Sequence, residues 1–335
     1  FCQAEDGIRD SECRVGSEMC IRDRYYKAIN WNVIEDELDN VVWERATSLF
    51  WLDTRIPIEE DREKWEKLSL QERKQLNRLL LFLANLSTYQ SIESVEVIRN
   101  SERSQQEIAI LNNLQFTEMV NTKAYNRILR VFNKEIDLQE EFDWIDTEPL
   151  VREYLEKIDT IYQGTNPMKK RFMAVCVEGL LNYAYLSYLF ELWIEKGFVN
   201  LGSMLGMIVR NESLHCYYLN HKIRLLLRET KPEQVKEFKN WGVYIVDYFV
   251  ELAIRLINDF YNLENSKTVA INLVKQEANH ILTGIGLNKA YQIDEKKLVT
   301  INRYLNELRK HDLSNRSDKN TVNAEESMNE SDYDF

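Results

Sequence analysis

The stretch MIVRNESLH, residues 207–215, decides how this chain is expected to fold. It lies in a mostly apolar run without proline, so we predict that it is helical. Glu212 and His215 are three residues apart, which places their side chains on one face of the helix. An isolated Glu-x-x-His pair is weak support for metal binding, because most such pairs lie on a protein surface. The pair becomes informative only if further carboxylates are buried nearby.

Polar residues interrupt the apolar faces of three more segments with helical spacing. These segments are NLSTYQ at 85–90, FTEMVN at 116–121 with Tyr125 one turn later, and VCVE at 175–178. A carboxylate inside a buried helix is costly unless it is paired, hydrogen-bonded or coordinated to a metal. Glu118, Glu178 and Glu212 would be three such carboxylates. Together with His215 they fit the pattern of a carboxylate-bridged metal centre inside a helical bundle.

Long segments without helix-breaking residues indicate an all-α fold. No proline lies between Pro57 and Pro149, and no glycine lies between Gly16 and Gly164. With 44% hydrophobic residues, the 335-residue chain can bury one large core. Apolar spacing and end signals, including a capping box at Ser69-Leu-Gln-Glu72, predict helices over Glu35–Leu52, Ser69–Asn100, Gln105–Phe132, Pro149–Tyr162, Pro167–Lys196, Leu201–Glu229, Pro232–Tyr261 and Ser266–Tyr291.

The composition limits which partners the protein is expected to bind and which cellular compartment it is expected to occupy. The net charge of −12 argues against nucleic-acid binding, which uses an excess of Lys and Arg. No run of about 18 apolar residues is present, so we expect no membrane span. With no secretory signal either, a cytoplasmic protein is expected. Cys176 and Cys216 are isolated in the sequence, and we expect reduced thiols in the core.

The two ends of the chain differ from the segment between them. Cys2, Cys13 and Cys20 allow a redox or metal cluster, but EDGIRD at 5–10 and EMCIRDR at 18–24 look like translated sequencing-adapter read-through. We therefore interpret residues 1–24 as a non-native, adapter-derived segment and exclude them from fold reasoning. Residues 25–311 should form one helical domain. Residues 312–335 are polar and acidic and should form a flexible tail.

Five motifs resemble the class Ib small subunit of ribonucleotide reductase. They are YYKAINWN at 25–32, FWLDTRIP at 50–57, LNNLQFTE at 111–118, VRNESLH at 209–215 and SDYDF at 331–335. The resemblance implies a ferritin-like helical bundle, usually a homodimer, with a dimanganese or diiron site that oxidises a nearby tyrosine to a radical. It also implies a large-subunit partner, to which the radical is relayed for reduction of ribonucleoside diphosphates to deoxyribonucleotides.

The resemblance assigns roles to individual residues. It implies metal ligation by Glu118, Glu178, Glu212 and His215, a radical at Tyr125, radical relay through Trp51, and docking of the tail on the large subunit through Tyr333. In the family, the residues matching Glu178 and His215 are terminal ligands of the second metal. Those matching Glu118 and Glu212 bridge the two metals.

Four positions depart from the family pattern at this site. Ser87 stands where the family has an Asp ligand, and Asn121 where it has a His ligand. Asn211 replaces the Asp that links the relay Trp to that His. Asn182 replaces a Phe of the apolar pocket around the radical. Each change alone fits neutral drift or a satisfied core amide, but four changes in one site are not expected to be independent accidents.

These departures predict a weakened first metal site and an intact second one. The first site loses one negative charge and an imidazole, and the oxygens of Ser87 and Asn121 are neutral, weak donors to a divalent ion. We therefore expect one manganese or iron ion per chain rather than two. Asn211 and Asn121 could still hydrogen-bond to each other, but an amide does not titrate near neutral pH and cannot replace the carboxylate of the relay.

Three functions remain open on the sequence. The first is a reductase small subunit with an unusual radical initiator, using one metal or an oxidant made elsewhere, as the family's flavodoxin-like activase does. The second is a non-catalytic paralogue that binds the large subunit or a normal small subunit and regulates assembly. The third is a ferritin-like metal-binding protein without a reductase partner. The SDYDF tail argues against the third.

Overall fold

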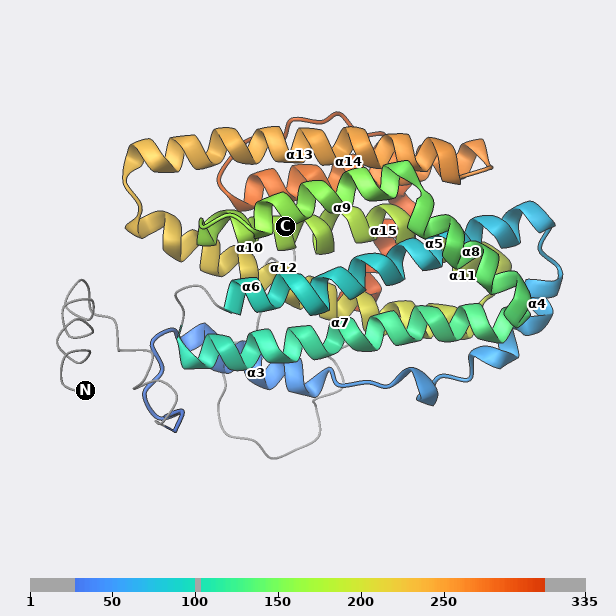
Figure 1. Ribbon diagram of the computed structural model, residues 1–335, viewed down its shortest axis with the longest axis horizontal. Coiled ribbons are helices and arrows are strands. Elements are labelled where there is room, and N and C mark those ends of the chain that lie inside the picture. Colours follow the sequence, from blue (N-terminus) through green and yellow to red (C-terminus); the bar gives the residue numbers. More distant parts are fainter. Residues whose placement is uncertain (1–27, 100–103, 311–335) are drawn as a thin grey trace, which may run out of the picture.

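The chain folds into a bundle of long helices that lie side by side (Figure 1). The computed structural model describes residues 28–99 and 104–310, and it contains helices and no β-strand in these ranges. The all-α prediction is thereby confirmed. In chain order the elements are α3 (Glu37–Ser48), η1 (Asp53–Arg55), η2 (Ile58–Asp61), α4 (Arg62–Glu66), α5 (Leu70–Tyr89), η3 (Gln90–Ser94), α6 (Val95–Arg99), α7 (Gln105–Phe132), α8 (Glu135–Thr147), α9 (Pro149–Tyr162), α10 (Pro167–Val175), η4 (Cys176–Leu181), α11 (Asn182–Lys196), α12 (Val199–Glu229), α13 (Pro232–Phe260), α14 (Glu264–Gly284) and α15 (Glu295–Lys310).

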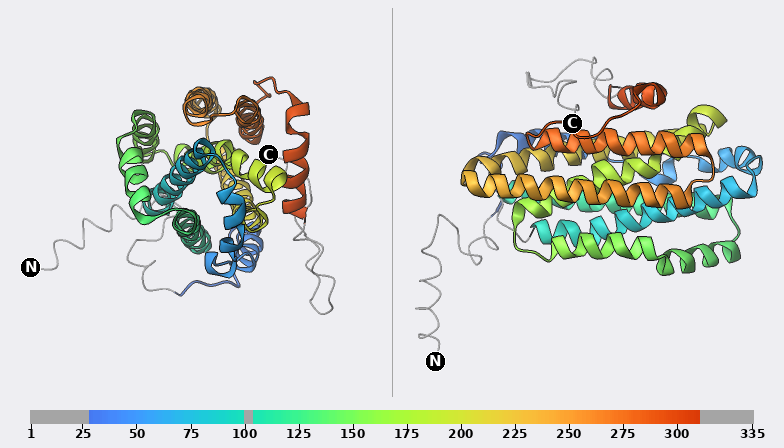
Figure 2. Two further views of the ribbon diagram at one scale, coloured as in Figure 1. Left: turned by 90° about the vertical axis from the view of Figure 1, so that its right-hand side faces the viewer. Right: turned by 90° about the horizontal axis from the view of Figure 1, so that it is seen from above.

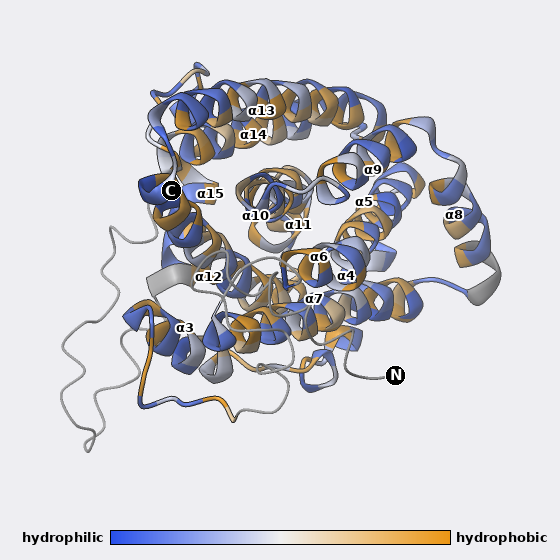
Figure 3. Cartoon of the chain, turned by 60° about the vertical axis from the view of Figure 1, so that its left-hand side comes forward, coloured by the Kyte–Doolittle hydropathy of each residue, from blue (hydrophilic) through white to orange (hydrophobic). Residues whose placement is uncertain are grey.

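One continuous helical rod, made of α10, η4 and α11, runs through the centre of the bundle (Figure 3). Every side chain from Arg171 to Phe190 is buried, because α12, α14 and α5 pack around the rod. The segment Pro167–Lys196 is long and apolar enough to cross a membrane by length and composition. Its apolar stretch is nevertheless fully buried in the bundle. The apolar character of this segment is therefore accounted for by its place in the core.

The remaining helices enclose this rod in pairs. Helix α5 packs along α7, α13 packs on α14, and α3 lies across α7 and α12. Helix α15 contacts α14 and α12 and crosses the bundle instead of running along it (Figure 2). The predicted capping box opens α5, with Ser69 Oγ accepting from the Glu72 amide and Glu72 accepting from the Ser69 amide.

Two of the expected long helices contain a π-helical turn. The expected helix over Ser69–Asn100 is interrupted by η3, and that over Pro167–Lys196 by η4. A π turn inserts one residue into an α-helix and changes which side chains face inward, and such turns often occur at functional sites. Here the two turns bring Gln90 and Glu178 into the interior.

Four helices differ from the sequence predictions. Helix α3 ends at Ser48, short of the predicted Leu52, where the hydroxyls of Thr47 and Ser48 bond back to carbonyls of their own helix. Helix α14 ends at Gly284 instead of Tyr291, because Gly286 adopts a φ of 73° and closes a Schellman motif. Helices α8 and α15 were not predicted.

Candidate metal centre

Four side chains from three elements meet in the interior of the bundle. Helix α7 supplies Glu118, η4 supplies Glu178, and α12 supplies both Glu212 and His215. One ligand atom from each residue lies within 4.8 Å of the others, and all four side chains are buried. The convergence expected from the sequence is present, and none of the four points to solvent.

The Glu178 side of this cluster is closely hydrogen-bonded. Nδ1 of His215 lies 2.9 Å from Oε2 of Glu178 and 3.6 Å from Oε1 of Glu118. The other oxygen of Glu178, Oε1, accepts a hydrogen bond of 2.9 Å from the Gln90 amide. Both oxygens of Glu178 are thus held in defined directions.

The burial of these groups changes their proton affinities. Burial raises the pKa of Glu178, and it raises the pKa of Glu212 well above the usual range, with the Glu118 and Glu178 carboxylates adding to the rise. Burial acts to lower the pKa of His215, but the neighbouring Glu178 and Glu118 carboxylates outweigh it and raise that pKa to about 9. Without a cation these shifts favour protonated carboxyl groups, and a bound cation would stabilise their charged forms.

The residues present fit a divalent metal ion. Three carboxylates and one imidazole are a donor set that suits manganese or iron. Oε2 of Glu118 and Oε2 of Glu212 are buried and accept no hydrogen bond, so each retains donor capacity inside the cluster. A buried carboxylate oxygen without a partner is costly, and coordination of a cation removes that cost.

The part of the cluster around Glu118 and Glu212 is organised differently. Ser87 lies on α5 and is 1% exposed, yet its hydroxyl oxygen makes no hydrogen bond. The Asn121 amide donates to Oε1 of Glu212 over 3.0 Å and to Oε1 of Glu118 over 3.5 Å, while its own oxygen has no partner. The Asn121 side chain therefore presents an N–H group to the carboxylates, whereas a metal ligand at this position would present a lone pair.

Tyr125 and Asn182 lie on the same side of the cluster. Tyr125 is fully buried, its hydroxyl makes no hydrogen bond, and burial followed by the nearby Glu212 and Glu118 raises its pKa well above the usual range. Neither the nitrogen nor the oxygen of the Asn182 amide forms a hydrogen bond of normal geometry. The amide is nevertheless close enough to Glu212 to favour the charged form of that carboxyl group and so to lower its pKa. Tyr125 and the Asn182 amide are thus both close to Glu212.

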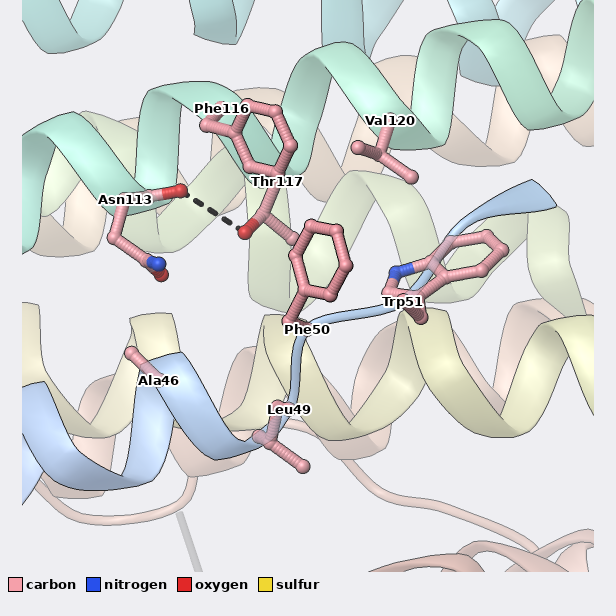
Figure 4. A pocket seen from close by; sticks show the side chains of 8 residues that line it. All are labelled: Ala46, Leu49, Phe50, Trp51, Asn113, Phe116, Thr117 and Val120. Atoms are coloured by element: carbon pink, nitrogen blue, oxygen red, sulfur yellow. Dashed lines mark hydrogen bonds between the residues drawn. The ribbon is translucent and has the colours of Figure 1, made fainter. Parts of the chain in front are cut away.

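Trp51 lies in the extended segment after α3, beside Val120 of α7 and next to Phe50, which stacks on Phe116 (Figure 4). The indole N–H of Trp51 is buried and makes no hydrogen bond. Asn211 donates to the backbone oxygen of Met207 in its own helix.

Asn121 and Asn211, the two amides expected in the relay, therefore form hydrogen bonds with different partners and not with each other. Asn211 bonds within its helix, and Asn121 bonds to Glu212 and Glu118. The expectation that the two amides could bond to each other is not met. The physical reason is that two carboxylates are stronger acceptors for the Asn121 N–H than a second amide.

Two buried residues without a role predicted from the sequence connect to the cluster, Gln90 directly and Tyr162 through Gln90. Gln90 donates to Glu178, and the Tyr162 hydroxyl donates to Oε1 of Gln90 over 2.7 Å. Gln90 was visible as a polar residue on an apolar helical face, which was the available signal. Tyr162 carried no such signal, because a tyrosine at a helical core position is ordinary.

A helical bundle that encloses a buried carboxylate–histidine cluster defines the class of ferritin-like metal-binding proteins. Residues 28–297 match the family described as ribonucleotide reductase, small chain. The chain belongs to this family, and its relatives place it in class Ib.

The relatives include both curated proteins and a solved structure. The chain is 26% identical over 268 residues to ribonucleoside-diphosphate reductase subunit beta nrdF1 of Mycobacterium tuberculosis, covering 80% of this chain and 83% of the relative. It is 28% identical over 240 residues to ribonucleoside-diphosphate reductase 2 subunit beta of Escherichia coli, covering 70% and 73%. The dimanganese(II)-NrdF structure from Streptococcus sanguinis matches with a TM-score of 0.80 and 29% identity, covering 84% of this chain and 99% of that one.

Some sequence predictions fall outside the described residues. These are the adapter-derived interpretation of residues 1–24, the acidic tail at 312–335, and Tyr333 within that tail. Cys176 and Cys216 are described, and both are buried and not joined in a disulfide, as expected.

Proposed function

We propose that this chain is the radical-generating small subunit of a class Ib ribonucleoside-diphosphate reductase. The observation that carries the proposal is the buried cluster of Glu118, Glu178, Glu212 and His215, with Tyr125 on the same side of the bundle. Membership of the small-chain family supports it, as do the printed names of the curated relatives.

The proposed division of labour within the cluster follows the donor geometry. Glu178 and His215 hold one manganese or iron ion as terminal ligands, and Glu118 and Glu212 complete its coordination. Once oxidised by an oxidant supplied from outside the chain, the bound metal would be the one-electron acceptor for oxidation of a tyrosine to a radical. Ser87 and Asn121 do not hold a second ion, because one is a neutral hydroxyl and the other directs an N–H group at the carboxylates.

Tyr125 is the proposed radical site. Its burial excludes water, and its raised pKa keeps the hydroxyl protonated, so an electron can leave only together with that proton. Trp51 is the proposed relay residue, but its indole N–H has no hydrogen bond to Asn211 or Asn121. We therefore expect little or no turnover with oxygen and metal alone. Because a single metal ion does not readily supply the multi-electron oxygen chemistry that forms the radical, an oxidant made elsewhere, as by a flavodoxin-like activase, would be required to form it.

The absence of hydrogen bonds from Trp51 to Asn211 or Asn121 also favours a second candidate, a non-catalytic small-subunit paralogue with a degenerate metal site. Reconstitution with the large subunit decides between the two. The enzyme should give a tyrosyl radical signal by electron paramagnetic resonance, and deoxynucleotide product, once a flavodoxin-like activase is added. The paralogue would give neither under any of these conditions, while still binding the large subunit.

The proposed partners follow from family membership. They are the reductase large subunit and a second copy of this chain, in a cytoplasmic complex without nucleic acid or membrane. The tail is the proposed docking element, because buried aromatic anchors usually dominate binding energy and Tyr333 and Phe335 are its aromatic residues.

Truncation tests this docking role. Removing Asn329–Phe335 should abolish binding to the large subunit in a pull-down or calorimetric titration, with the melting temperature unchanged, because a polar tail adds little to the core. Removing residues 1–24 is the matched control and should leave binding intact. Equal affinity of the full-length and tail-truncated chains would contradict the docking role.

A further inference from the structure

A chain of hydrogen bonds leads away from the cluster on its Glu178 side. Tyr162 donates to Oε1 of Gln90 over 2.7 Å, and Nε2 of Gln90 donates to Oε1 of Glu178 over 2.9 Å. Oε2 of Glu178 lies 2.9 Å from Nδ1 of His215. All four side chains are buried, with at most 4% exposure. A fixed series of contacts therefore joins Tyr162 of α9 to the proposed metal ligand.

The hydrogen bond between Gln90 and Glu178 joins the π-helical turns η3 and η4. Gln90 is the first residue of η3, and Glu178 lies within η4. In an uninterrupted α-helix the extra residue of each turn would be absent, and the side chains that follow it would rotate to another face. Both local irregularities thus contribute to one hydrogen bond between buried side chains.

The direction of each hydrogen bond is fixed by its neighbours. Turning the Gln90 amide over would place its oxygen against the Glu178 carboxylate, which is repulsive, and would lose the bond accepted from Tyr162. Burial also raises the pKa of Tyr162, so its hydroxyl keeps the proton that it donates. The arrangement leaves Oε2 of Glu178 as the oxygen that faces His215 and the cluster.

We propose that Gln90 and Tyr162 are positioning residues of the metal site, which hold Glu178 so that it ligates through Oε2 alone. This inference rests on the proposed metal site. Gln90 acts directly on the ligand, and Tyr162 acts through Gln90 by fixing the orientation of its amide. Outer partners of this kind typically change metal affinity by about 10-fold to 100-fold when they are removed.

Two variants and a matched control test the proposal on the full chain. Gln90→Met keeps the side-chain length but removes both hydrogen bonds, and Tyr162→Phe removes only the hydroxyl. The control is Tyr154→Phe, because Tyr154 is equally buried and donates to Asn85, which belongs to no part of the cluster. Mn²⁺ affinity is measured by titration followed with electron paramagnetic resonance, and thermal stability by circular dichroism.

We expect Gln90→Met and Tyr162→Phe each to weaken Mn²⁺ binding by about 10-fold. The double variant should bind no more weakly than Gln90→Met, because the two residues act in series. With Co²⁺ as the probe, both variants should change the visible absorption spectrum, since the coordination of Glu178 changes. Tyr154→Phe should lose thermal stability like Tyr162→Phe while keeping wild-type affinity and spectrum.

Three results would overturn the proposal. They are wild-type Mn²⁺ affinity in both Gln90→Met and Tyr162→Phe, an equal loss of affinity in Tyr154→Phe, and additive losses in the double variant. Each of these leaves the metal site itself in place. A wild-type chain that takes up no Mn²⁺ would instead contradict the proposed function together with this inference.

Discussion

The two sides of the buried cluster differ in how completely their polar groups are bonded. On the Glu178 side, His215, Glu178, Gln90 and Tyr162 form consecutive hydrogen bonds. Near Glu118 and Glu212, the Asn121 oxygen and the Tyr125 hydroxyl are buried without a hydrogen-bond partner, and so is the Ser87 hydroxyl on α5.

This difference separates a part of the cluster that is organised to hold a cation from a part whose polar groups lack partners. Buried polar groups in proteins are nearly always hydrogen-bonded, so each exception calls for a physical explanation. The proposed explanation is that Asn121 and Ser87 stand at positions where the family pattern has a His and an Asp ligand, so that neutral side chains take the place of groups that would bind a second ion.

The largest effect should follow the loss of a carboxylate from the cluster. Glu212→Ala removes both a ligand and one of three negative charges, so metal uptake should fall from about one ion per chain to almost none. Metal content after dialysis measures this directly. Glu191→Gln is the control, because Glu191 is partly buried outside the cluster and accepts from Ser266. Undiminished metal content in Glu212→Ala would show that the ion binds elsewhere.

Introducing the family's ligand types at positions 87 and 121 should create a second metal-binding site. The double change Ser87→Asp with Asn121→His returns one negative charge and one imidazole, so metal content should rise by about one ion per chain. Single changes should add less than the pair. If the double variant holds no more metal than the wild type, the loss of the first site has a cause other than these two residues.

Radical relay should be restored only when the metal ligands expected at positions 87 and 121 are also restored. Asn211→Asp alone should not raise reductase turnover with oxygen and metal, because the imidazole link through position 121 is still missing. Adding Ser87→Asp and Asn121→His to it should raise turnover above background. Product formation with the large subunit measures the difference. Full turnover in Asn211→Asp alone would mean that the imidazole is dispensable.

The smallest effect concerns stability. Asn182→Leu replaces a buried amide that has no normal hydrogen bond, so the unfolding free energy of the metal-free chain should rise by about 1 kcal/mol. Asn279→Leu is the matched control. Asn279 bonds to the backbone of Ala290 and Tyr291, and its loss should cost about 2 kcal/mol. The comparison would be contradicted if urea denaturation showed that both variants change the unfolding free energy in the same direction.

Much of the fold follows from the sequence because apolar spacing and absent breakers act locally. The helices over Gln105–Phe132 and Pro149–Tyr162 have the predicted bounds. The π turns at Gln90 and Cys176 could not be predicted, since a single inserted residue leaves helical spacing nearly unchanged. The end of α14 was missed because the positive φ of Gly286 acts through a six-residue motif.

The cluster was predictable because a carboxylate within an apolar helix has few stable alternatives to coordination or pairing. Its four residues were identified before any geometry was known, and they converge. The hydrogen bonds of Asn121 and Gln90 were not predictable, because they join residues 91 and 88 positions away along the chain. Which carboxylate an amide contacts depends on how the helices pack.

Metal stoichiometry of the wild-type chain tests the central claim most directly. Purified protein is loaded with excess Mn²⁺, dialysed, and analysed by elemental analysis and by electron paramagnetic resonance. We expect about one tightly bound ion per chain with the six-line signal of an isolated Mn²⁺ centre, because only the Glu178 side is complete. Two tightly bound ions per chain, with the signal of a coupled pair, would contradict it.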